Sequence, residues 1–324
     1  MTDSLAEKPP SPPPSDLAII ILGYNSREHY PACLNSLHTA IQHAAAHPYT
    51  VRVIVVDNAS TDGTPDFIRQ HYPWVELIVT ERNGGFSYGN NHGLRTAGLP
   101  ATPTVRYAML LNPDTITPPT ALTALLAYAD THPDIGALGP RLLLPDGSLD
   151  KACKRGEPTP LTSLYHFSGL SRLFRNSPHF ARYNMTFLPD DQTADVDSTV
   201  GACTLYRASV LQHIGLMDET FFMYGEDLDY NLRVRQAGYR VVYYPAVTVQ
   251  HLKGAASRKA PEKMIRAFYD AMKIFHRKHY AARYPAPFNW LVYTAIDLLC
   301  TYKLWRNARL PETQRVVGSA RPIT

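Results

Sequence analysis

The sequence predicts an α/β fold in which a mostly parallel central sheet is flanked by helices, with a helical extension at the C-terminal end. Two continuous apolar runs rich in β-branched residues, at 17–22 and 51–56, are typical of strands buried on both faces. Between these runs, apolar residues recur at helical spacing, at Leu34, Leu37, Ile41 and Ala44. This pattern predicts a strand–helix–strand unit with a right-handed crossover.

Two further strands extend the predicted parallel part of the sheet. Thr64 and Pro65 supply an N-cap and a first-turn proline, which predicts a helix over 65–71. Apolar runs at 75–79 and 107–111 predict the third and fourth strands. We therefore expect polar loops at the carboxyl edge of this sheet, where open α/β sheets bind their ligands.

The second half of the chain is less regular. It contains a predicted strand at 135–140 and a hairpin turn within 141–148. A proline-, serine- and arginine-rich stretch follows at 151–197, and we expect it to be a mobile loop region because its apolar periodicity is weak. Regular structure is predicted to resume with a strand at 200–206, helices at 207–214 and 226–237, and strands at 239–244 and 246–249.

The composition is that of a globular chain, with 324 residues of which 45% are hydrophobic and 19% are charged. The four cysteines are widely separated and form no CxxC pair, which argues against a zinc site or a disulfide framework and favours a reducing cytoplasm. Residues 1–16 are rich in proline and contain no apolar run. They predict a disordered leader and no signal peptide.

The C-terminal part is strongly basic. Residues 251–310 contain twelve Lys or Arg against three acidic residues, Glu262, Asp270 and Asp297. A nucleic acid partner is not predicted, because no helix-turn-helix, zinc-finger or aromatic RNA-binding signature accompanies these charges. An anionic membrane surface fits them better, and would make the protein peripheral on the inner face of the plasma membrane.

The longest apolar segment, 288–305, lies within this basic part. It carries Asp297 and Lys303 and is shorter than the ~20 apolar residues that a transmembrane helix needs. Its apolar residues share one helical face, formed by Leu291, Ala295, Leu298, Tyr302 and Trp305. Two interpretations stay open: a helix docked on the core, or an interfacial helix anchored by Trp290 and Trp305.

Acidic residues occupy two positions that suit a site. Asp114 follows the fourth predicted strand in the sequence Asn-Pro-Asp-Thr, although this is also ordinary turn chemistry before a helix capped at Thr117 or Thr120. Glu226 and Asp227 open a predicted helix after a glycine, where acidic residues also interact favourably with the helix dipole.

Four motifs follow the four predicted strands in order: Gly23-Tyr24-Asn25, Asp57-Asn58, Asn83-Gly84-Gly85 to Asn90, and Asn112-Pro113-Asp114. Together they resemble the family-2 glycosyltransferases with a GT-A fold, most closely the rhamnosyltransferase-like branch, from about residue 17 to about 259. The resemblance implies a catalytic domain at 17–250, with a nucleotide-binding half at 17–130 and an acceptor half at 131–250. A basic helical extension at 251–310 and a tail at 311–324 would follow.

The resemblance also implies a donor site for a nucleotide-diphosphate sugar, dTDP- or UDP-linked. Tyr24 would stack on the base and Asp57 would accept a hydrogen bond from a ring N–H, although Asp57 is also a candidate turn residue. Asn83, Gly84 and Gly85 would let the backbone approach the donor, or form a plain left-handed turn. The implied donor-binding residues are Gly23, Tyr24, Asn25, Asp57, Asn58, Asn83, Gly84, Gly85, Asn90 and Asn112.

In most of the family the metal motif is Asp-x-Asp, and this chain departs from it with Asn112 in the first position. Asp114 is then the one carboxylate of the motif that can bind Mg2+ or Mn2+. His251, at the end of a predicted strand, matches a position at which related enzymes supply a further ligand. Hard divalent cations prefer oxygen ligands and are often completed by substrate phosphates.

The family places its catalytic base at the second acid of the Glu226-Asp227 pair, so Asp227 is the expected base and Glu226 an acceptor-binding or orienting residue. Asp229 is expected to face solvent or a neighbouring arginine. The function implied is an inverting, metal-dependent transfer of a sugar, L-rhamnose from dTDP-rhamnose foremost, to a lipid-linked or polysaccharide acceptor in cell-envelope glycan synthesis.

Two alternatives are weighed against this function. A Rossmann oxidoreductase is disfavoured because no GxGxxG follows either of the first two predicted strands. A non-catalytic module that binds a sugar nucleotide or glycan is suggested by the missing first Asp of the metal motif. The joint presence of Asp114, Asp227 and His251 argues against it.

Overall fold

The computed structural model describes residues 15–253 and 261–310. Within these residues all the strands belong to one nine-stranded sheet. The strands are β1 (Ser15–Gly23), β2 (Val51–Asp57), β3 (Glu76–Val79), β4 (Val105–Leu111), β5 (Thr115–Ile116), β6 (Ile135–Leu143), β7 (Ala194–Asp195), β8 (Cys203–Arg207) and β9 (Arg240–His251). Their order is β3-β2-β1-β4-β8-β6-β9-β5, with β7 paired to β9. Six strands point one way and β5, β7 and β8 the other, so the predicted mostly parallel sheet is confirmed.

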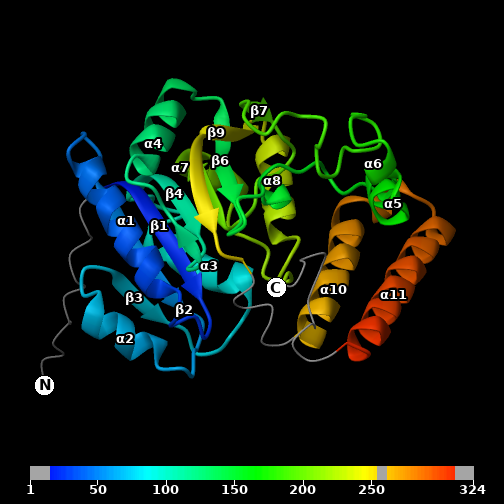
Figure 1. Cartoon of the computed structure of the whole chain (residues 1–324), viewed down its shortest axis with the longest axis horizontal. Coiled ribbons are helices and arrows are strands. Elements are labelled where there is room, and N and C mark those ends of the chain that lie inside the picture. The colour runs from blue at the N-terminus through cyan, green and yellow to red at the C-terminus, as the bar shows by residue number, and fades with distance from the viewer. Residues whose placement is uncertain (1–14, 254–260, 311–324) are drawn as a thin grey trace, which may run out of the picture.

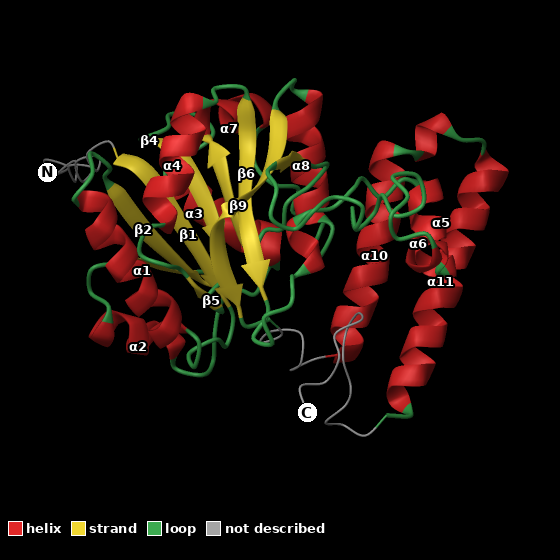
Figure 2. Cartoon of the chain, turned by 45° about the horizontal axis from the view of Figure 1, so that its top comes forward, coloured by secondary structure: helices red, strands yellow, loops and turns green. Residues whose placement is uncertain are grey.

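Helices cover both faces of this sheet. They are α1 (Tyr30–Ala45), α2 (Thr64–His71), α3 (Phe86–Thr96), α4 (Ala121–Thr131), α5 (Pro160–Ser168), α6 (Leu170–Leu173), α7 (Ala208–Ile214), α8 (Glu226–Gln236), α10 (Pro261–His279) and α11 (Ala286–Ala308), with short 3-10 turns η1 (Lys151–Cys153) and η2 (Ala281–Arg283). Figures 1 and 2 show α1 and α4 together on one face and α7 and α8 on the other. The arrangement is the α/β architecture predicted from the sequence.

The first half follows the predicted order of elements. Strand β1 lies between β2 and β4, with Leu17 opposite both Val51 and Tyr107. Its apolar residues from Leu17 to Ile21 are completely buried, as expected for a strand covered by helices on both faces. Gly23 lies opposite Asp57 in the ladder, so the polar loops after these strands begin at one edge of the sheet.

Helix α3 was not predicted from the sequence. The helix has no broad apolar stripe and packs on β1 through small residues instead. A Cβ atom at Gly89 would lie 2.2 Å from a methyl carbon of Leu22, and one at Gly93 would lie 2.4 Å from a methyl carbon of Ile20. Backbone-to-strand packing of this kind leaves no hydrophobic periodicity in the sequence.

The prediction of a mobile loop region at 151–197 is wrong where this segment forms η1, α5, α6 and β7. The segment is held by polar anchors. Lys154 is buried and donates to the carbonyls of Leu188 and Pro189, while Arg155 pairs its backbone with Ser198. Its apolar side chains on α5 and α6 face outward, and this reversal of the usual pattern explains the weak periodicity.

The two strands predicted at 239–244 and 246–249 form the single strand β9. Its pairing with β6 shifts register between Tyr244, opposite Pro140, and Thr248, opposite Arg141. Pro245 falls inside this irregularity, and proline cannot donate to a ladder hydrogen bond. The sequence therefore suggested a break where the strand only bulges.

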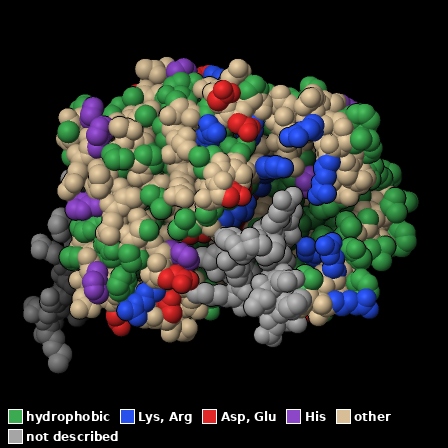
Figure 3. Space-filling view, viewed as in Figure 1, with side chains coloured by type: hydrophobic (Ala, Val, Ile, Leu, Met, Phe, Trp, Pro, Cys, Tyr) green, Lys and Arg blue, Asp and Glu red, His purple; other side chains and the backbone are tan. Residues whose placement is uncertain are grey.

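The C-terminal extension is a pair of helices that stands beside the sheet (Figure 1). Helix α10 packs on the body of the protein through Phe275 and Ala271, which cluster with Phe221 and Leu232. Helix α11 packs on α10, where Ile296 clusters with Ile265 and Tyr269. No helix within the described ranges is both long and apolar enough to cross a membrane. Figure 3 shows apolar side chains gathered over the outer side of this region.

The face of 288–305 predicted to be apolar is the exposed face of α11, since Leu291, Ala295, Leu298, Tyr302 and Trp305 are all exposed. These five residues are therefore not a docking face, and α11 packs on α10 through its other side, with Ile296 against Ile265 and Tyr269. Most of the predicted leader and the whole tail 311–324 lie outside the described residues, but Ser15 and Asp16 already belong to β1.

Candidate active site

The predicted donor site lies in the loops that leave β1 and β2. Asp57, the last residue of β2, is completely buried, and its Oδ1 accepts a hydrogen bond from the backbone N–H of Ser60 at 2.8 Å. Its Oδ2 is buried and receives no hydrogen bond from a described residue. Burial raises the pKa of Asp57. The ring of Tyr24, in contrast, is 39% exposed in the neighbouring loop.

Two of the predicted donor-site asparagines hold the loops together. Asn25 has a positive φ of 50° and accepts from the backbone N–H of Thr61 at 2.8 Å, which ties the first loop to the second. Asn58 is buried, and its amide donates to Asn83 Oδ1 at 3.0 Å and to the carbonyl of Gly85 at 3.1 Å. Both residues thus shape the loop backbone, whether or not they also contact a ligand.

The glycine loop is fixed by close backbone contacts. Gly85 has φ of 91°, and a Cβ atom there would lie 2.2 Å from the carbonyl oxygen of Phe222. The next residue, Phe86, donates its backbone N–H to the same oxygen at 2.7 Å. Only glycine fits both the left-handed conformation and the contact. This contact joins the loop after β3 to the segment that leads into Glu226.

The remaining donor-site candidates are placed as follows. Gly84 is packed under the ring of Tyr88, and Gly23 under the hydroxyl of Tyr30. Asn90 is buried within α3, where its amide donates to the carbonyl of Phe86 at 3.0 Å. Asn112 follows β4 and is half-buried.

The predicted metal ligands meet at the ends of β4 and β9. Asp114 Oδ1 lies 3.4 Å from Nε2 of His251, and this buried oxygen receives no well-directed hydrogen bond from a described residue. Burial alone would raise the pKa of Asp114, but the contact with His251 keeps it below its usual range. Thr115 pairs with His251 in the β5–β9 ladder, so the backbone itself holds the two side chains together.

A third residue, Asp150, completes this group and was missed in the sequence. Its Oδ2 lies 3.0 Å from Nδ1 of His251, and its Oδ1 accepts from Lys253 at 2.7 Å. Asp150 is 2% exposed. Burial by itself would lower the pKa of His251, but Asp114 and Asp150 raise it to about 9. No sequence motif marks Asp150, because it reaches His251 across 101 positions of the chain.

These residues fit a divalent cation in part. Asp114 offers a buried oxygen without a hydrogen-bond donor, and His251 has the outer-sphere carboxylate that orients metal-bound histidines. Across residues 15–253 and 261–310, no group of three or more His, Cys, Asp or Glu could enclose an ion by itself. A cation at this place therefore needs oxygens from a substrate phosphate, the usual way in which Mg2+ is completed.

The predicted catalytic pair stands at the start of α8. Tyr224 and Gly225, with φ of 71° and 76°, form a left-handed turn that ends the apolar run and directs the first residues of α8 inward. Glu226 and Asp227 are 6% and 5% exposed, and Glu226 Oε2 is buried without a hydrogen-bond partner among the described residues. Burial first, and the neighbouring Asp227 second, raise the pKa of Glu226 to about 8.

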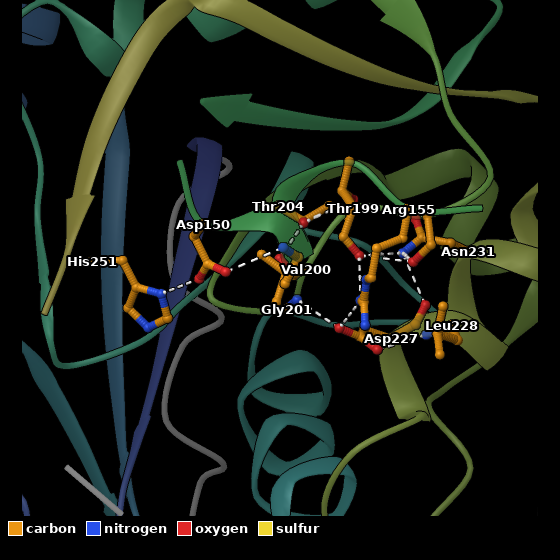
Figure 4. A network of polar contacts seen from close by, with 12 residues as sticks. Asp150, Arg155, Thr199, Val200, Gly201, Thr204, Asp227, Leu228, Asn231 and His251 are labelled. Carbon is orange, nitrogen blue, oxygen red and sulfur yellow. Dashed lines mark hydrogen bonds and ion pairs between the residues drawn. The ribbon is translucent and has the colours of Figure 1, made fainter. Parts of the chain in front are cut away.

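Asp227 is paired with Arg155, a second residue that the sequence did not reveal. The guanidinium donates to Asp227 Oδ2 at 2.5 Å; the Asp227 side chain is buried, and the Arg155 side chain is 12% exposed. The same oxygen faces the N–H of Gly201 at 3.4 Å. Figure 4 shows this pair and the His251–Asp150 pair on either side of Val200 and Gly201. The only signal for Arg155 was a basic doublet, Lys154-Arg155, inside the stretch interpreted as a loop.

Asp229 is not exposed to solvent, which corrects one expectation. It is completely buried and binds Arg233 at 3.0 Å, Lys278 at 2.7 Å and His279 at 2.8 Å. The expected arginine partner is confirmed. The two α10 partners show that Asp229 is an anchor between α8 and α10.

Comparisons with solved structures assign the fold. TarS 1-349 of S. aureus superposes with a TM-score of 0.52 at 17% identity, covering 91% of this chain and 75% of that one. The mannosyltransferase PcManGT from Pyrobaculum calidifontis, in complex with GDP-Man and Mn2+, gives a TM-score of 0.51 at 18% identity, covering 94% and 76%. The fold is that of the GT-A glycosyltransferases.

Sequence comparisons then give the family. The model described as glycosyltransferase like family 2 matches residues 12–269. An N-acetylglucosaminyl-diphospho-decaprenol L-rhamnosyltransferase of Mycobacterium tuberculosis is 30% identical over 287 residues, which are 87% of this chain and 91% of that protein. The chain belongs to glycosyltransferase family 2 and is a glycosyltransferase. The resemblance inferred from the four motifs is confirmed, and the oxidoreductase alternative is wrong.

The raised pKa of Glu226 predicts a pH-dependent stability. Between the ordinary glutamate value and about 8, the folded protein holds a proton that the unfolded chain has released, so stability falls as pH rises through this window. Replacing Glu226 by Gln removes this proton, and we expect the melting temperature of the variant to fall less than that of the wild type from about pH 5 to about pH 8. The exposed Glu262→Gln change is the control. Parallel curves for all three proteins would contradict the assignment.

Proposed function

We propose that this enzyme is an inverting, metal-dependent glycosyltransferase that moves a sugar from a nucleotide-diphosphate donor to a lipid-linked or polysaccharide acceptor. One observation carries the proposal: three carboxylates at one edge of the sheet, Asp57, Asp114 and Glu226, each keep a buried oxygen that no described residue satisfies with a hydrogen bond. Buried carboxylate oxygens are normally paired. The three are suited to a base N–H of the donor, a cation on its diphosphate, and an acceptor hydroxyl.

The chemical step needs a base on the face of the sugar opposite the leaving diphosphate. Asp227 takes the proton of the attacking acceptor hydroxyl, and the new bond forms as the bond to the diphosphate breaks, which inverts the anomeric centre. Arg155, whose side chain is largely covered, holds the carboxylate of Asp227 in place. Glu226, protonated over much of the neutral range, donates a hydrogen bond to the acceptor.

Asp114 and His251 are the residues that would hold Mg2+ or Mn2+. When bound, the cation offsets the charge that develops on the leaving diphosphate. Asn112 adds only a neutral oxygen. Asp150 orients the ring of His251 through Nδ1, which leaves Nε2 directed at Asp114.

The donor and acceptor follow from the relatives by analogy. The mycobacterial relative is named for the transfer of L-rhamnose to a diphospho-decaprenol-linked sugar. We infer L-rhamnose from a dTDP-linked donor, with a UDP-linked sugar as the second choice, and an acceptor of cell-envelope glycan synthesis whose lipid brings the enzyme to an anionic membrane surface on the cytoplasmic side. Donor hydrolysis without acceptor would distinguish this enzyme from a module that only binds a sugar nucleotide.

Replacing Asp114 by Ala tests metal dependence. We expect turnover to be lost, because the variant keeps no carboxylate in the metal motif, and Mn2+ should no longer strengthen dTDP binding in calorimetry. The exposed Asp66→Ala change on α2 is the control for loss of one negative charge. Full activity of the Asp114 variant in metal-free buffer would end the hypothesis.

Replacing Asp150 by Asn tests the orientation of His251. The affinity for Mn2+ in the presence of dTDP should fall by about 10-fold to 100-fold, the usual effect of losing an outer-sphere partner of a metal-bound histidine. Lys253→Gln, which removes the other contact of Asp150, should have a smaller effect. Circular dichroism confirms that each variant is folded, and an unchanged Mn2+ affinity would refute the role.

Replacing Asp227 by Asn tests the base. We expect kcat to fall by about 100-fold or more while the donor dissociation constant stays near that of the wild type, because only proton transfer is lost. The exposed Asp191→Asn change serves as the control. A collapse of donor affinity with unchanged kcat at saturation would place Asp227 in the donor site instead.

A further inference from the structure

Large apolar side chains are exposed on two elements that are distant in the sequence. On α5, α6 and the residue after α6 they are Leu161, Leu164, Phe167, Leu173 and Phe174. On α11 they are Trp290, Leu291, Leu298, Tyr302 and Trp305. These ten make up most of the fourteen exposed large hydrophobic residues of the described chain. Figures 1 and 2 both show α5 and α6 beside α11, and Figure 3 shows the apolar side chains over this region.

The exposure of apolar side chains is extensive for a protein surface in contact with water. Leu173 is 73% exposed, Trp290 68% and Leu298 65%. Helix α5 has no buried residue, and α11 buries only Ile296 and Asn307 along its whole length. A concentrated group of exposed apolar side chains marks a surface that a protein partner or a membrane covers.

The charges beside these residues are mostly positive. Residues 158–189 contain arginines and no aspartate or glutamate. In 286–310 the single acidic residue, Asp297, is already paired with Lys273 of α10. Arg172, Arg175 and Arg306 form no ion pair with a described residue, and Arg309 stacks on the ring of Trp305. A second copy of the chain would bring like charges together, whereas an anionic surface would complement them.

We propose that α5, α6 and α11 form one docking platform that inserts its apolar side chains into an anionic lipid bilayer. Apolar side chains flanked by arginine and tryptophan are the composition of interfacial membrane elements. The proposal rests on the lipid-linked acceptor of the proposed function, and it names the surface of the protein that meets the lipid. The platform also includes α5 and α6, which cannot be recognised from the basic composition of the C-terminal part.

The platform is connected to the catalytic pair. The chain enters α5 shortly after Arg155, the partner of Asp227. Glu157, which lies between Arg155 and α5, binds Arg235 of α8 at 2.8 Å and accepts a hydrogen bond from the hydroxyl of Tyr280. Where the segment returns, Ser198 forms an isolated antiparallel β-bridge with Arg155. A bilayer held by the platform would therefore present the head of an amphiphilic acceptor close to Asp227.

Vesicle binding tests the platform. The full chain is sedimented with vesicles of equal parts phosphatidylglycerol and phosphatidylcholine, and with phosphatidylcholine alone. We expect binding to the first that weakens with salt, and at least about tenfold weaker binding for Leu173→Ser/Phe174→Ser and for Leu298→Ser/Trp305→Ser, because each change removes two inserted side chains. Val79→Ser with Trp74→Ser, exposed elsewhere on the molecule, should bind like the wild type.

Insertion has a direct spectroscopic readout. In a Trp74→Phe variant the remaining tryptophans, Trp290 and Trp305, both lie on α11. Their fluorescence should shift to the blue and be quenched by brominated lipid in anionic vesicles only. Quenching would be lost if charge attraction alone held the protein at the surface, and that result would overturn insertion.

Two further outcomes would overturn the platform. One is equal vesicle binding by wild type and both double variants, with melting temperatures that show each to be folded. The other is a dimer in sedimentation velocity that the double variants abolish, because the covered face would then belong to a second copy. Donor hydrolysis is measured in parallel: its absence from every protein would count against the proposed function alone, since vesicle binding does not depend on it.

Discussion

The largely covered ion pair between Arg155 and Asp227 is the constraint on which the arrangement around the expected base depends. Two charged groups removed from water are tolerable only when each compensates the other, and leaving one unpaired costs about 3–5 kcal/mol. Satisfying this requirement draws the segment after η1 against α8 and the loop before β8. The expected base, the loop around Gly201 and the entry to α5 are thereby fixed by one contact.

The central sheet connects the loops after β1 and β2 with the part of the chain that leads to the expected base. The loops proposed to bind the donor follow parallel strands whose ends are aligned, with Gly23 opposite Asp57 and Ile21 opposite Leu111. The chain that leads to the expected base passes through the antiparallel strand β8, which pairs with β4. The sheet therefore runs unbroken from β3 to β5.

Sequence reasoning located the strands of the first half and the residues at their ends because burial on both faces leaves long apolar runs. It also located Glu226 and Asp227 at the start of a helix. It could not locate Asp150 or Arg155, since a polar contact between distant positions produces no local pattern. It misjudged α5 and α6 for a related reason: their apolar residues face outward, so the usual link between periodicity and burial is reversed.

The contact between Gly85 and Phe222 has a consequence for how such an enzyme can diverge. The loop after β3 meets the segment that leads into Glu226 through the carbonyl oxygen of Phe222, not through its ring. Any residue at 222 offers the same oxygen, whereas position 85 admits only glycine. Substitutions at 222 therefore keep the hydrogen bond from Phe86 and the shape of the loop after β3, whereas substitutions at 85 do not. The contact thus restricts the residue type at position 85 but not at position 222.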